Sequence, residues 1–304
     1  MSSKTLIAVV GPTAIGKTSL GILLAKYFKT EILSADSRQF FKEMEIGTAV
    51  PSKEELQKVR HHFIQHKNIF EPYSVGDFEK EALQLLDVLF ENKDVVIMVG
   101  GSGLYVDAVV QGLDDFPEVD PKIRKALNSK LKEGGLESLQ KELQEWDPEY
   151  YKIVDVENPH RLIRALEVSI TAQKPYSSFL NQKKTKRPFR HLYVGIEASR
   201  ETIYERINTR VDLMMETGLL EEARRLHPHK NLNALQTVGY KELFEYLDGL
   251  SSLEEAISEI KKNTRRFAKR QLTWLRKNKN ILWVDYDERP EEILNKVKER
   301  IKTL

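Results

Sequence analysis

The chain of 304 residues contains no cysteine, which excludes disulfide bonds and thiolate metal sites. No apolar run approaches the roughly 18 residues that a membrane-spanning helix needs. The amino terminus lacks the apolar segment and small-residue cleavage site of a signal peptide. A net charge of +2 is too small to indicate a partner by itself. We therefore expect a cytoplasmic protein that does not associate with membranes.

Short apolar runs alternate with helical patterns in the first third of the chain. Residues 5–10 and 95–99 are short apolar runs of the kind that forms strands buried on both faces of a parallel sheet, and residues 31–34 look like another buried strand. Residues 19–27 and 78–91 have the periodicity of helices. This alternation predicts an α/β fold with a doubly wound parallel sheet.

The middle of the chain differs from both ends. Residues 117–190 contain helical patterns and many charges but no convincing strand, and strand patterns resume at 191–196 and 281–284. The sequence shows no internal repeat and no low-complexity linker. We predict a sheet core formed by residues 1–116 and 191–304, interrupted by an all-helical insertion of residues 117–190.

The sequence GPTAIGKT follows the first predicted strand and precedes a helix, which satisfies the pattern G-x-x-x-x-G-K-[ST] in its proper context. Backbone N–H groups of such a loop wrap a phosphate, and the helix dipole adds to the attraction. Lys17 supplies charge to the terminal phosphates, and the Thr18 hydroxyl can ligate Mg²⁺. A chance glycine turn would not combine all these features. The predicted diphosphate or triphosphate site consists of Gly11, Pro12, Thr13, Ala14, Ile15, Gly16, Lys17 and Thr18.

An acidic residue stands in an unusual place for a P-loop protein. A P-loop ATPase carries an acid at the end of a later strand, but here the third predicted strand ends in glycines and Ser102. Asp36 follows the second predicted strand instead. Because ligands bind at the carboxyl ends of parallel strands, we expect Asp36 to face the loop across neighbouring strands and to accept a proton from a nucleophile. Taken alone, Asp36 could equally be a turn former or helix cap with no role in proton transfer, because aspartate often has that structural role after a strand.

Several motifs together resemble the bacterial tRNA dimethylallyltransferases, also called tRNA isopentenyltransferases. They are GPTAIGKT, SADSRQFFKEMEIGTAVPS, VGGSGLYVDAVVQGL, NPHRLIRALEV and RQLTWLR, in the family's order and spacing over nearly the whole chain. Ser102 replaces the family's usual threonine but keeps the hydroxyl. The resemblance implies transfer of a dimethylallyl group from dimethylallyl diphosphate to a tRNA adenosine, at its exocyclic amine, with release of diphosphate. That adenosine would be the one adjacent to the anticodon on its 3′ side.

The resemblance also implies roles for the matched positions. The loop would hold the prenyl diphosphate with Mg²⁺, Asp36 would be the general base, and Lys17 and Arg210 would neutralise the leaving diphosphate. The family further suggests a monomer, and a buried site would require the adenine to leave its stack. The positions expected to bind the anticodon stem-loop of tRNA are Asp36, Ser37, Arg38, Gln39, Ser102, Arg124, His160, Arg161, Leu162, Ile163, Arg164, Gln236, Thr237, Val238, Gly239, Tyr240 and Lys241.

Positive charge is concentrated near the carboxyl terminus, where residues 261–279 contain nine Lys or Arg and no acid. On a helix, Lys262, Arg266 and Arg270 would share one face, with Phe267 and Trp274 free to pack elsewhere. Such a face suits an RNA backbone, although many basic faces contact only solvent. A second basic cluster, residues 183–190, ends the predicted insertion.

Two further functions remain open from the residues alone. A small-molecule or nucleoside kinase also combines a P-loop with an acid after the second strand, and its chemistry would be phosphoryl transfer. A non-catalytic RNA-binding P-loop protein would not need Asp36 or Arg210. A zinc site at His61, His62 and His66 is disfavoured, because no acid or cysteine at suitable spacing completes it.

Overall fold

The computed structural model describes residues 4–180 and 186–304, which divide into two compact units. The larger unit comprises Met1–Gln111 and Arg187–Leu304, and the smaller unit is Gly112–Lys186. None of the helices in the described part of the chain is long and apolar enough to cross a membrane.

The boundaries of the smaller unit lie a few residues before the predicted limits of 117 and 190. At the first boundary, Phe116 stacks on Tyr176 within the smaller unit. At the second, Phe189 is buried against Phe90 of the larger unit. These contacts near the two boundaries join residues far apart in the sequence, which a local pattern does not reveal.

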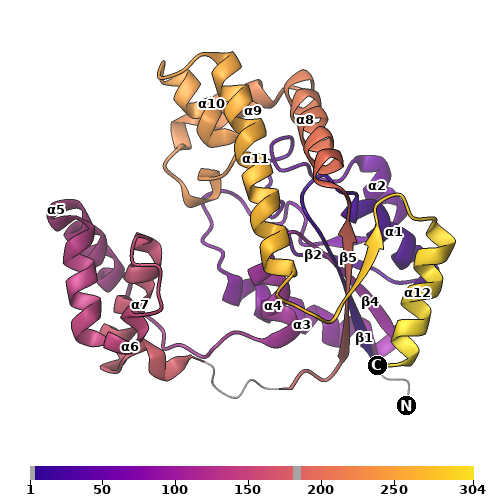
Figure 1. Ribbon diagram of the computed structural model, residues 1–304, viewed down its shortest axis with the longest axis horizontal. Coiled ribbons are helices and arrows are strands. Elements are labelled where there is room, and N and C mark those ends of the chain that lie inside the picture. The colour runs from indigo at the N-terminus through magenta and orange to yellow at the C-terminus, as the bar shows by residue number, and fades with distance from the viewer. Residues whose placement is uncertain (1–3, 181–185) are drawn as a thin grey trace. The chain divides into compact units, whose positions relative to one another are not determined.

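Six parallel strands form the sheet of the larger unit, in the order β3-β2-β4-β1-β5-β6 (Figure 1). This arrangement confirms the predicted α/β fold. Strand β3 could not be predicted, because two residues are too few to form a pattern. The strands are β1 (Thr5–Val10), β2 (Ile32–Ser34), β3 (His61–His62), β4 (Val95–Val99), β5 (Arg190–Glu197) and β6 (Ile281–Asp285).

Alternate residues of β1 enter two separate cores, one on each face of the sheet, as strand geometry requires. Leu6, Ala8 and Val10 join the core covered by α3, α4, α10 and α11, and Ile7 and Val9 join the core covered by α1, α8 and α12. The helices of this unit are α1 (Lys17–Phe28), α2 (Lys53–Lys58), α3 (Val75–Asn92), α4 (Gly103–Gln111), α8 (Arg200–Glu216), α9 (Leu219–Leu226), α10 (Tyr240–Leu247), α11 (Leu253–Leu275) and α12 (Pro290–Lys302), with short 3₁₀ turns at His227–His229 and Asn233–Leu235.

The smaller unit has a core of its own, and its described residues form helices and no strand. Leu139 and Leu143 pack with Leu162 and Leu166 in that core, where all four are fully buried. Gly135 interrupts α5 with φ +67°, so α5 is in effect two helices joined at a glycine. The elements are α5 (Pro121–Trp146), α6 (Pro148–Tyr151), α7 (Pro159–Ala172) and a 3₁₀ turn at Tyr176–Phe179.

Candidate active site

The phosphate loop joins the carboxyl end of β1 to the first turn of α1. Gly16, which precedes Lys17, has φ +105°, a conformation that favours glycine. Ala14 also has positive φ, +66°, and its carbonyl accepts a hydrogen bond from Arg206 Nε at 2.8 Å. A Cβ atom on Gly11 would lie 3.0 Å from the carbonyl oxygen of Ile196 on β5. The loop therefore has the tight shape that the sequence motif predicted.

The Lys17 ammonium group lies over this loop and donates a hydrogen bond to the Pro12 carbonyl at 2.7 Å. Burial lowers the pKa of Lys17 to about 8, a shift that Asp36 opposes and Arg210 increases. Because both residues act on Lys17, all three charged groups belong to one site. An anion bound here would favour the charged ammonium and restore much of its lost hydration.

Arg210 brings a second cation to the site from α8. Burial lowers its pKa, Arg206 lowers it further, and Asp36 and Glu55 oppose the shift. Among the described residues Arg210 forms no ion pair, so its guanidinium retains donors for a ligand. Lys17, Arg206 and Arg210 thus concentrate positive charge at the phosphate loop, where a diphosphate would neutralise it.

Asp36 follows β2 and Ala35, whose N–H donates to the Val99 carbonyl at 2.7 Å. The expectation that Asp36 faces the loop across adjacent strands needs correction, because β4 lies between β1 and β2. Asp36 reaches the site because the chain passes very close to Gly100, where a Cβ atom would lie 2.5 Å from the Ala35 carbonyl oxygen. One carboxylate oxygen accepts from the Arg38 N–H at 3.1 Å, so Asp36 shapes a turn as well.

Ser37 and Ser102 connect the loop after β2 to the loop after β4. Ser102 Oγ accepts from the Ser37 N–H, and the two hydroxyl oxygens lie 3.2 Å apart. The Ser102 hydroxyl that replaces the family's threonine therefore fixes the residue next to Asp36. This contact places Ser102 beside the residue that follows Asp36.

Arg38 and Gln39 are turned toward the protein rather than toward solvent. The Arg38 guanidinium donates to the carbonyls of Asn233 and Ala234, at 3.3 and 3.0 Å. The Gln39 side chain donates to the Thr48 carbonyl at 3.2 Å and accepts from the Ser34 hydroxyl. Both side chains therefore hold the loop after β2 in place, and only their remaining donors are available to RNA.

A buried carboxylate holds the backbone of the loop after β2. Glu222, on α9, accepts three backbone N–H bonds, from Glu45, Ile46 and Gly47, at 2.9–3.0 Å. Its fourth donor is the Tyr240 hydroxyl at 2.7 Å, and burial raises the pKa of Tyr240 far above its ordinary value. Tyr240 is fully buried. Within the predicted RNA segment, the Tyr240 side chain thus faces the core, whereas Gln236 and Lys241 are exposed.

In the smaller unit, two of the predicted RNA-binding arginines share one buried carboxylate. Arg124 forms two hydrogen bonds with Glu167, at 2.7 and 2.9 Å, and Arg164 forms one at 2.8 Å. The Arg124 and Arg164 side chains are 55% and 39% exposed, whereas that of Glu167 is 2% exposed, so a net positive charge reaches the surface. His160 and Arg161 are also exposed, but Leu162 and Ile163 lie in the core of this unit.

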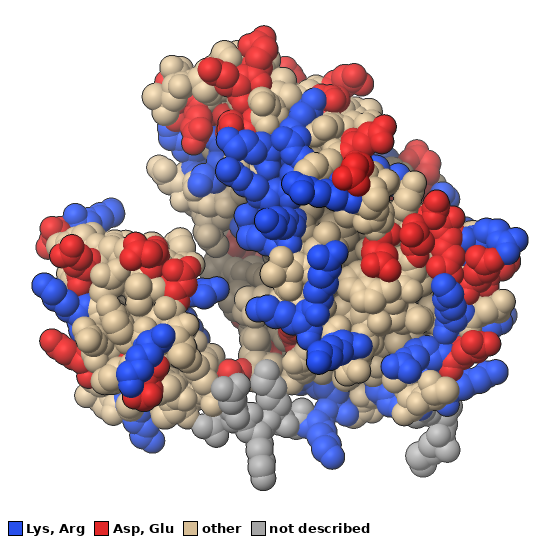
Figure 2. Space-filling model, viewed as in Figure 1, with Lys and Arg blue, Asp and Glu red and all other residues tan. Residues whose placement is uncertain are grey.

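Basic residues gather along α11, as Figure 2 shows for the face in view. Two of them are neutralised, because Lys261 pairs with Asp212 and Lys262 pairs with Glu259. Arg270 lies over the ring of Phe267, which is 37% exposed. The expectation that Phe267 packs elsewhere is therefore wrong, because this ring supports the arginine at the surface instead.

The other predicted clusters have structural partners. Residues 183–185 lie outside the described part of the chain, and Arg187 pairs with Glu79 and donates to the carbonyls of Ala108 and Val109. His62 Nε2 lies 2.6 Å from a carboxylate oxygen of Glu31, and His61 bonds the Val59 carbonyl. His66 is surrounded by the rings of Phe40, Phe63 and Tyr73.

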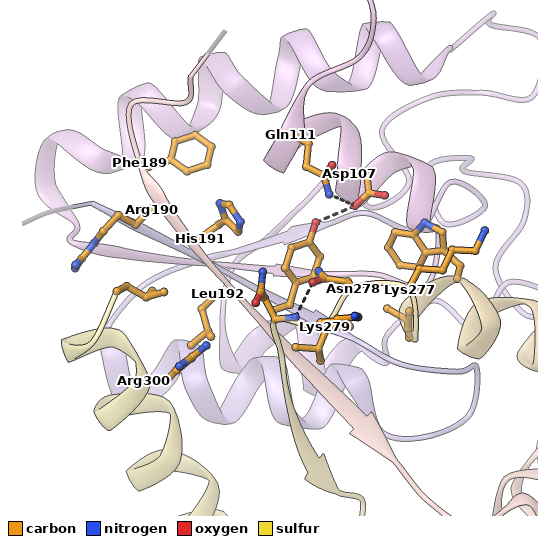
Figure 3. A pocket seen from close by; sticks show the side chains of 16 residues that line it. Asp107, Gln111, Phe189, Arg190, His191, Leu192, Lys277, Asn278, Lys279 and Arg300 are labelled. Atoms are coloured by element: carbon orange, nitrogen blue, oxygen red, sulfur yellow. Dashed lines mark hydrogen bonds between the residues drawn. The ribbon is translucent and has the colours of Figure 1, made fainter. Parts of the chain in front are cut away.

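A cavity of about 1010 Å³ lies elsewhere in the larger unit (Figure 3). Its lining includes Arg190 and Ile281, with which β5 and β6 begin, whereas the phosphate loop follows the carboxyl end of β1. None of the residues that line it is among the predicted site residues. The cavity is therefore separate from the candidate active site.

Sequence reasoning gave no role to three residues that shape the site. Arg206 holds the phosphate loop, Glu222 holds the loop after β2, and Gln271 bonds Thr13 and Gly101. Gln271 stands in the RQLTWLR motif, which was the only available sign of its importance. Arg206 and Glu222 lie in the segment 205–222 that also contains Arg210, but the motif did not indicate what they bond.

A P-loop fold that joins half-buried cations to a nearby carboxylate defines a class of enzymes that act on phosphorylated substrates. The profile of the IPP transferase family matches residues 39–278. The tRNA dimethylallyltransferase of Christiangramia forsetii is 62% identical over 99% of this chain and 100% of its own, and that of Flavobacterium johnsoniae is 58% identical over 99% of both. The chain therefore belongs to the IPP transferase family.

Solved structures agree with this assignment. A crystal structure of the full-length tRNA isopentenylpyrophosphate transferase of Bacillus halodurans is 36% identical, with a TM-score of 0.73 over 99% of this chain and 97% of that chain. A eukaryotic dimethylallyltransferase, described as acting on tRNA, has a TM-score of 0.80 at 26% identity, over 93% of this chain and 74% of that chain. The predicted family and its enzyme class, the prenyltransferases, are confirmed, and the matches do not support a kinase.

Proposed function

We propose that the enzyme transfers a dimethylallyl group from dimethylallyl diphosphate to tRNA, at the exocyclic amine of the adenosine adjacent to the anticodon on its 3′ side. The relatives named tRNA dimethylallyltransferase support this activity. The observation that carries the chemistry is geometric, because a Cβ atom on Gly101 would lie 3.6 Å from Lys17 Nζ, and the next residue, Ser102, bonds Ser37 beside Asp36. This site combines cations for a leaving group with a base for a nucleophile.

The cations would assist cleavage of the bond between the dimethylallyl group and its diphosphate. An allylic carbon–oxygen bond ionises readily when the diphosphate that departs with the electron pair is neutralised. Lys17 and Arg210 would supply that neutralisation from fixed positions, which need no reorganisation during the reaction. Their partial burial strengthens the interaction, because less water screens it.

Magnesium would add charge at the same place. The residues present fit this ion, because the half-buried Thr18 hydroxyl forms no hydrogen bond within the described residues and stands next to Lys17 at the start of α1. No group of three or more His, Cys, Asp or Glu that could hold a metal occurs in the described ranges. Mg²⁺ commonly uses one or two protein oxygens together with substrate phosphates, so we propose that Thr18 and the diphosphate would hold it.

Asp36 would assist formation of the bond between the adenine amine and the dimethylallyl group. The adenine amine is a poor nucleophile, because its lone pair is delocalised into the ring. As its nitrogen bonds the allylic carbon, the amine must lose a proton, and the Asp36 carboxylate would accept it. The Arg38 N–H and the loop contacts of Ser37 hold this carboxylate in place.

The partner RNA would meet exposed groups on each unit, taken separately. On the smaller unit these are Arg124, Arg164 and the exposed His160 and Arg161. On the larger unit they include the basic residues of α11 that have no acidic partner. We propose that these groups contact phosphates of the anticodon stem-loop, because phosphate contacts position an RNA without reading its sequence. We also propose a monomer, since the groups invoked for the chemistry all come from one chain.

A transfer assay tests the proposal directly. Purified enzyme, Mg²⁺ and dimethylallyl diphosphate are incubated with unmodified tRNA, and the oligonucleotides from a ribonuclease digest are analysed by mass spectrometry. The expected product is dimethylallyl adenosine at the position following the anticodon. A parallel incubation with ATP and nucleosides tests phosphoryl transfer, and phosphorylated nucleosides without any prenylated tRNA would reject the proposal.

A further inference from the structure

Gln271 is a buried polar side chain that the chemistry above does not use. It lies on α11 and is 6% exposed. Its side-chain oxygen accepts from the Thr13 N–H at 2.9 Å, and its side-chain nitrogen donates to the Gly101 carbonyl at 2.9 Å. The orientation of the amide is fixed by these partners, because a flipped amide would place its NH₂ group against the Thr13 N–H.

The two partners of this amide belong to the two loops that form the site. Thr13 is in the phosphate loop, and Gly101 precedes Ser102, whose hydroxyl bonds Ser37 beside Asp36. A Cβ atom on Gly101 would collide with the Gln271 side-chain nitrogen and would lie 3.6 Å from Lys17 Nζ. The amide therefore stands within a few ångströms of the catalytic lysine without bonding to it.

Neighbouring residues fix α11 in the position from which Gln271 reaches the loop. Trp274, one turn further along α11, packs so closely on Gly103 at the start of α4 that a Cβ atom there would collide with the indole ring. Leu275 and Ala268 are buried in the two cores on either side of the sheet. The helix is thus a rigid support for the amide.

We propose that Gln271 is a positioning residue that holds the phosphate loop in the shape that receives the diphosphate. This inference rests on the proposed role of the loop in binding dimethylallyl diphosphate. A loop that must order its N–H groups upon binding gains less affinity than one already ordered. By using the Thr13 N–H and anchoring the middle of the loop, Gln271 leaves the remaining N–H groups directed at the ligand.

The test replaces Gln271 with methionine, which is similar in size and forms neither hydrogen bond. Loss of the two bonds is expected to raise the KM for dimethylallyl diphosphate on the order of tenfold. The dissociation constant of inorganic diphosphate, measured by calorimetry, should rise in parallel. The turnover number at saturating donor and the affinity for tRNA should stay within roughly twofold of wild type, because the groups that react and those that touch RNA are unchanged.

Two companion variants separate this role from a general loss of packing. Gln84→Met makes the same change at an exposed position of α3 and should leave every constant at its wild-type value. Gly101→Ala adds the Cβ atom that displaces the Gln271 amide and should reproduce the rise in KM without altering Gln271. Should Gln271→Met fail to fold, Gln271→Leu replaces it, because this variant also lacks both hydrogen bonds and adds no charge near Lys17. It should also weaken diphosphate binding.

Three results would overturn the inference. Unchanged diphosphate affinity in Gln271→Met would mean that the loop is ordered without the amide. Tighter binding would mean that Gln271 competes with the ligand for the Thr13 N–H. An equal loss of tRNA affinity would assign Gln271 to the packing of α11. Calorimetry with inorganic diphosphate requires no transfer, so it tests Gln271 even if wild-type enzyme fails to prenylate tRNA and the proposed function is rejected.

Discussion

Replacement of Asp36 with asparagine isolates the proton acceptor from the rest of the site. The side-chain oxygen that accepts from the Arg38 N–H is retained in asparagine, so the turn after β2 should keep its shape. What is lost is a basic oxygen and a negative charge. General-base catalysis contributes roughly 10²–10⁴-fold, and we expect the single-turnover rate of transfer to fall by that factor.

The negative charge of Asp36 also affects the pKa of Lys17. Asp36 raises the pKa of Lys17, so its removal should let Lys17 lose its proton at lower pH. The assay is therefore performed near pH 7 and again near pH 6, where Lys17 remains protonated in both proteins. A rate defect of the same size at both values belongs to proton transfer, whereas a defect that disappears at the lower pH belongs to Lys17.

Saturating tRNA and donor are used in these single turnovers, so that weakened binding cannot imitate slow chemistry. Calorimetric binding of each substrate provides the control for retained folding and affinity. A variant that transfers within about threefold of the wild-type rate would refute general-base catalysis by Asp36.

The other predictions concern the cations. Lys17→Ala and Arg210→Ala should each lower the transfer rate on the order of 10²-fold with tRNA affinity nearly unchanged; a loss confined to tRNA binding would remove either residue from the diphosphate site. In wild-type enzyme, kcat/KM for dimethylallyl diphosphate should fall as pH rises through about 8, because free Lys17 loses its charge there, and a flat profile from pH 7 to 9 would contradict this. Arg266→Ala and Arg270→Ala should each weaken tRNA binding and make the slope of log affinity against log salt shallower by just under one unit; an unchanged slope would mean that α11 is a solvated surface.

Local pattern was sufficient for the parts of the fold that are long and strongly periodic. β1 and β4 consist almost entirely of apolar residues, and their predicted limits match the structure. The pattern could not show that β4 lies between β1 and β2, because strand order depends on contacts between distant segments. That order sets the place of Asp36, because the preceding residue, Ala35, packs closely on Gly100 after β4.

The residues of the candidate site likewise fall into those that a local motif reveals and those that depend on distant contacts. Lys17 and Thr18 are recognisable because their chemistry depends on neighbours in the sequence, which the loop motif contains. Gln271 and Arg206 act on the same loop from 258 and 192 residues away, counted from their bonds to Thr13 and Ala14. A hydrogen-bond partner at such a distance leaves no local pattern, so only the folded chain reveals it.

Burial also distinguishes two kinds of residue that a family motif does not separate. Tyr240 and Lys241 are adjacent, and the resemblance assigns both to RNA, yet Tyr240 is fully buried and Lys241 is exposed. The Tyr240 hydroxyl is the fourth donor to Glu222. Loss of this hydrogen bond would leave the buried carboxylate without one donor and would lower the stability of the folded protein by roughly 1–3 kcal/mol. Such a residue is constrained by the protein's own interior, because the loop over Glu222 depends on it. A position in a motif can therefore be constrained either by the ligand or by the support of the loop that meets the ligand, and side-chain exposure tells which.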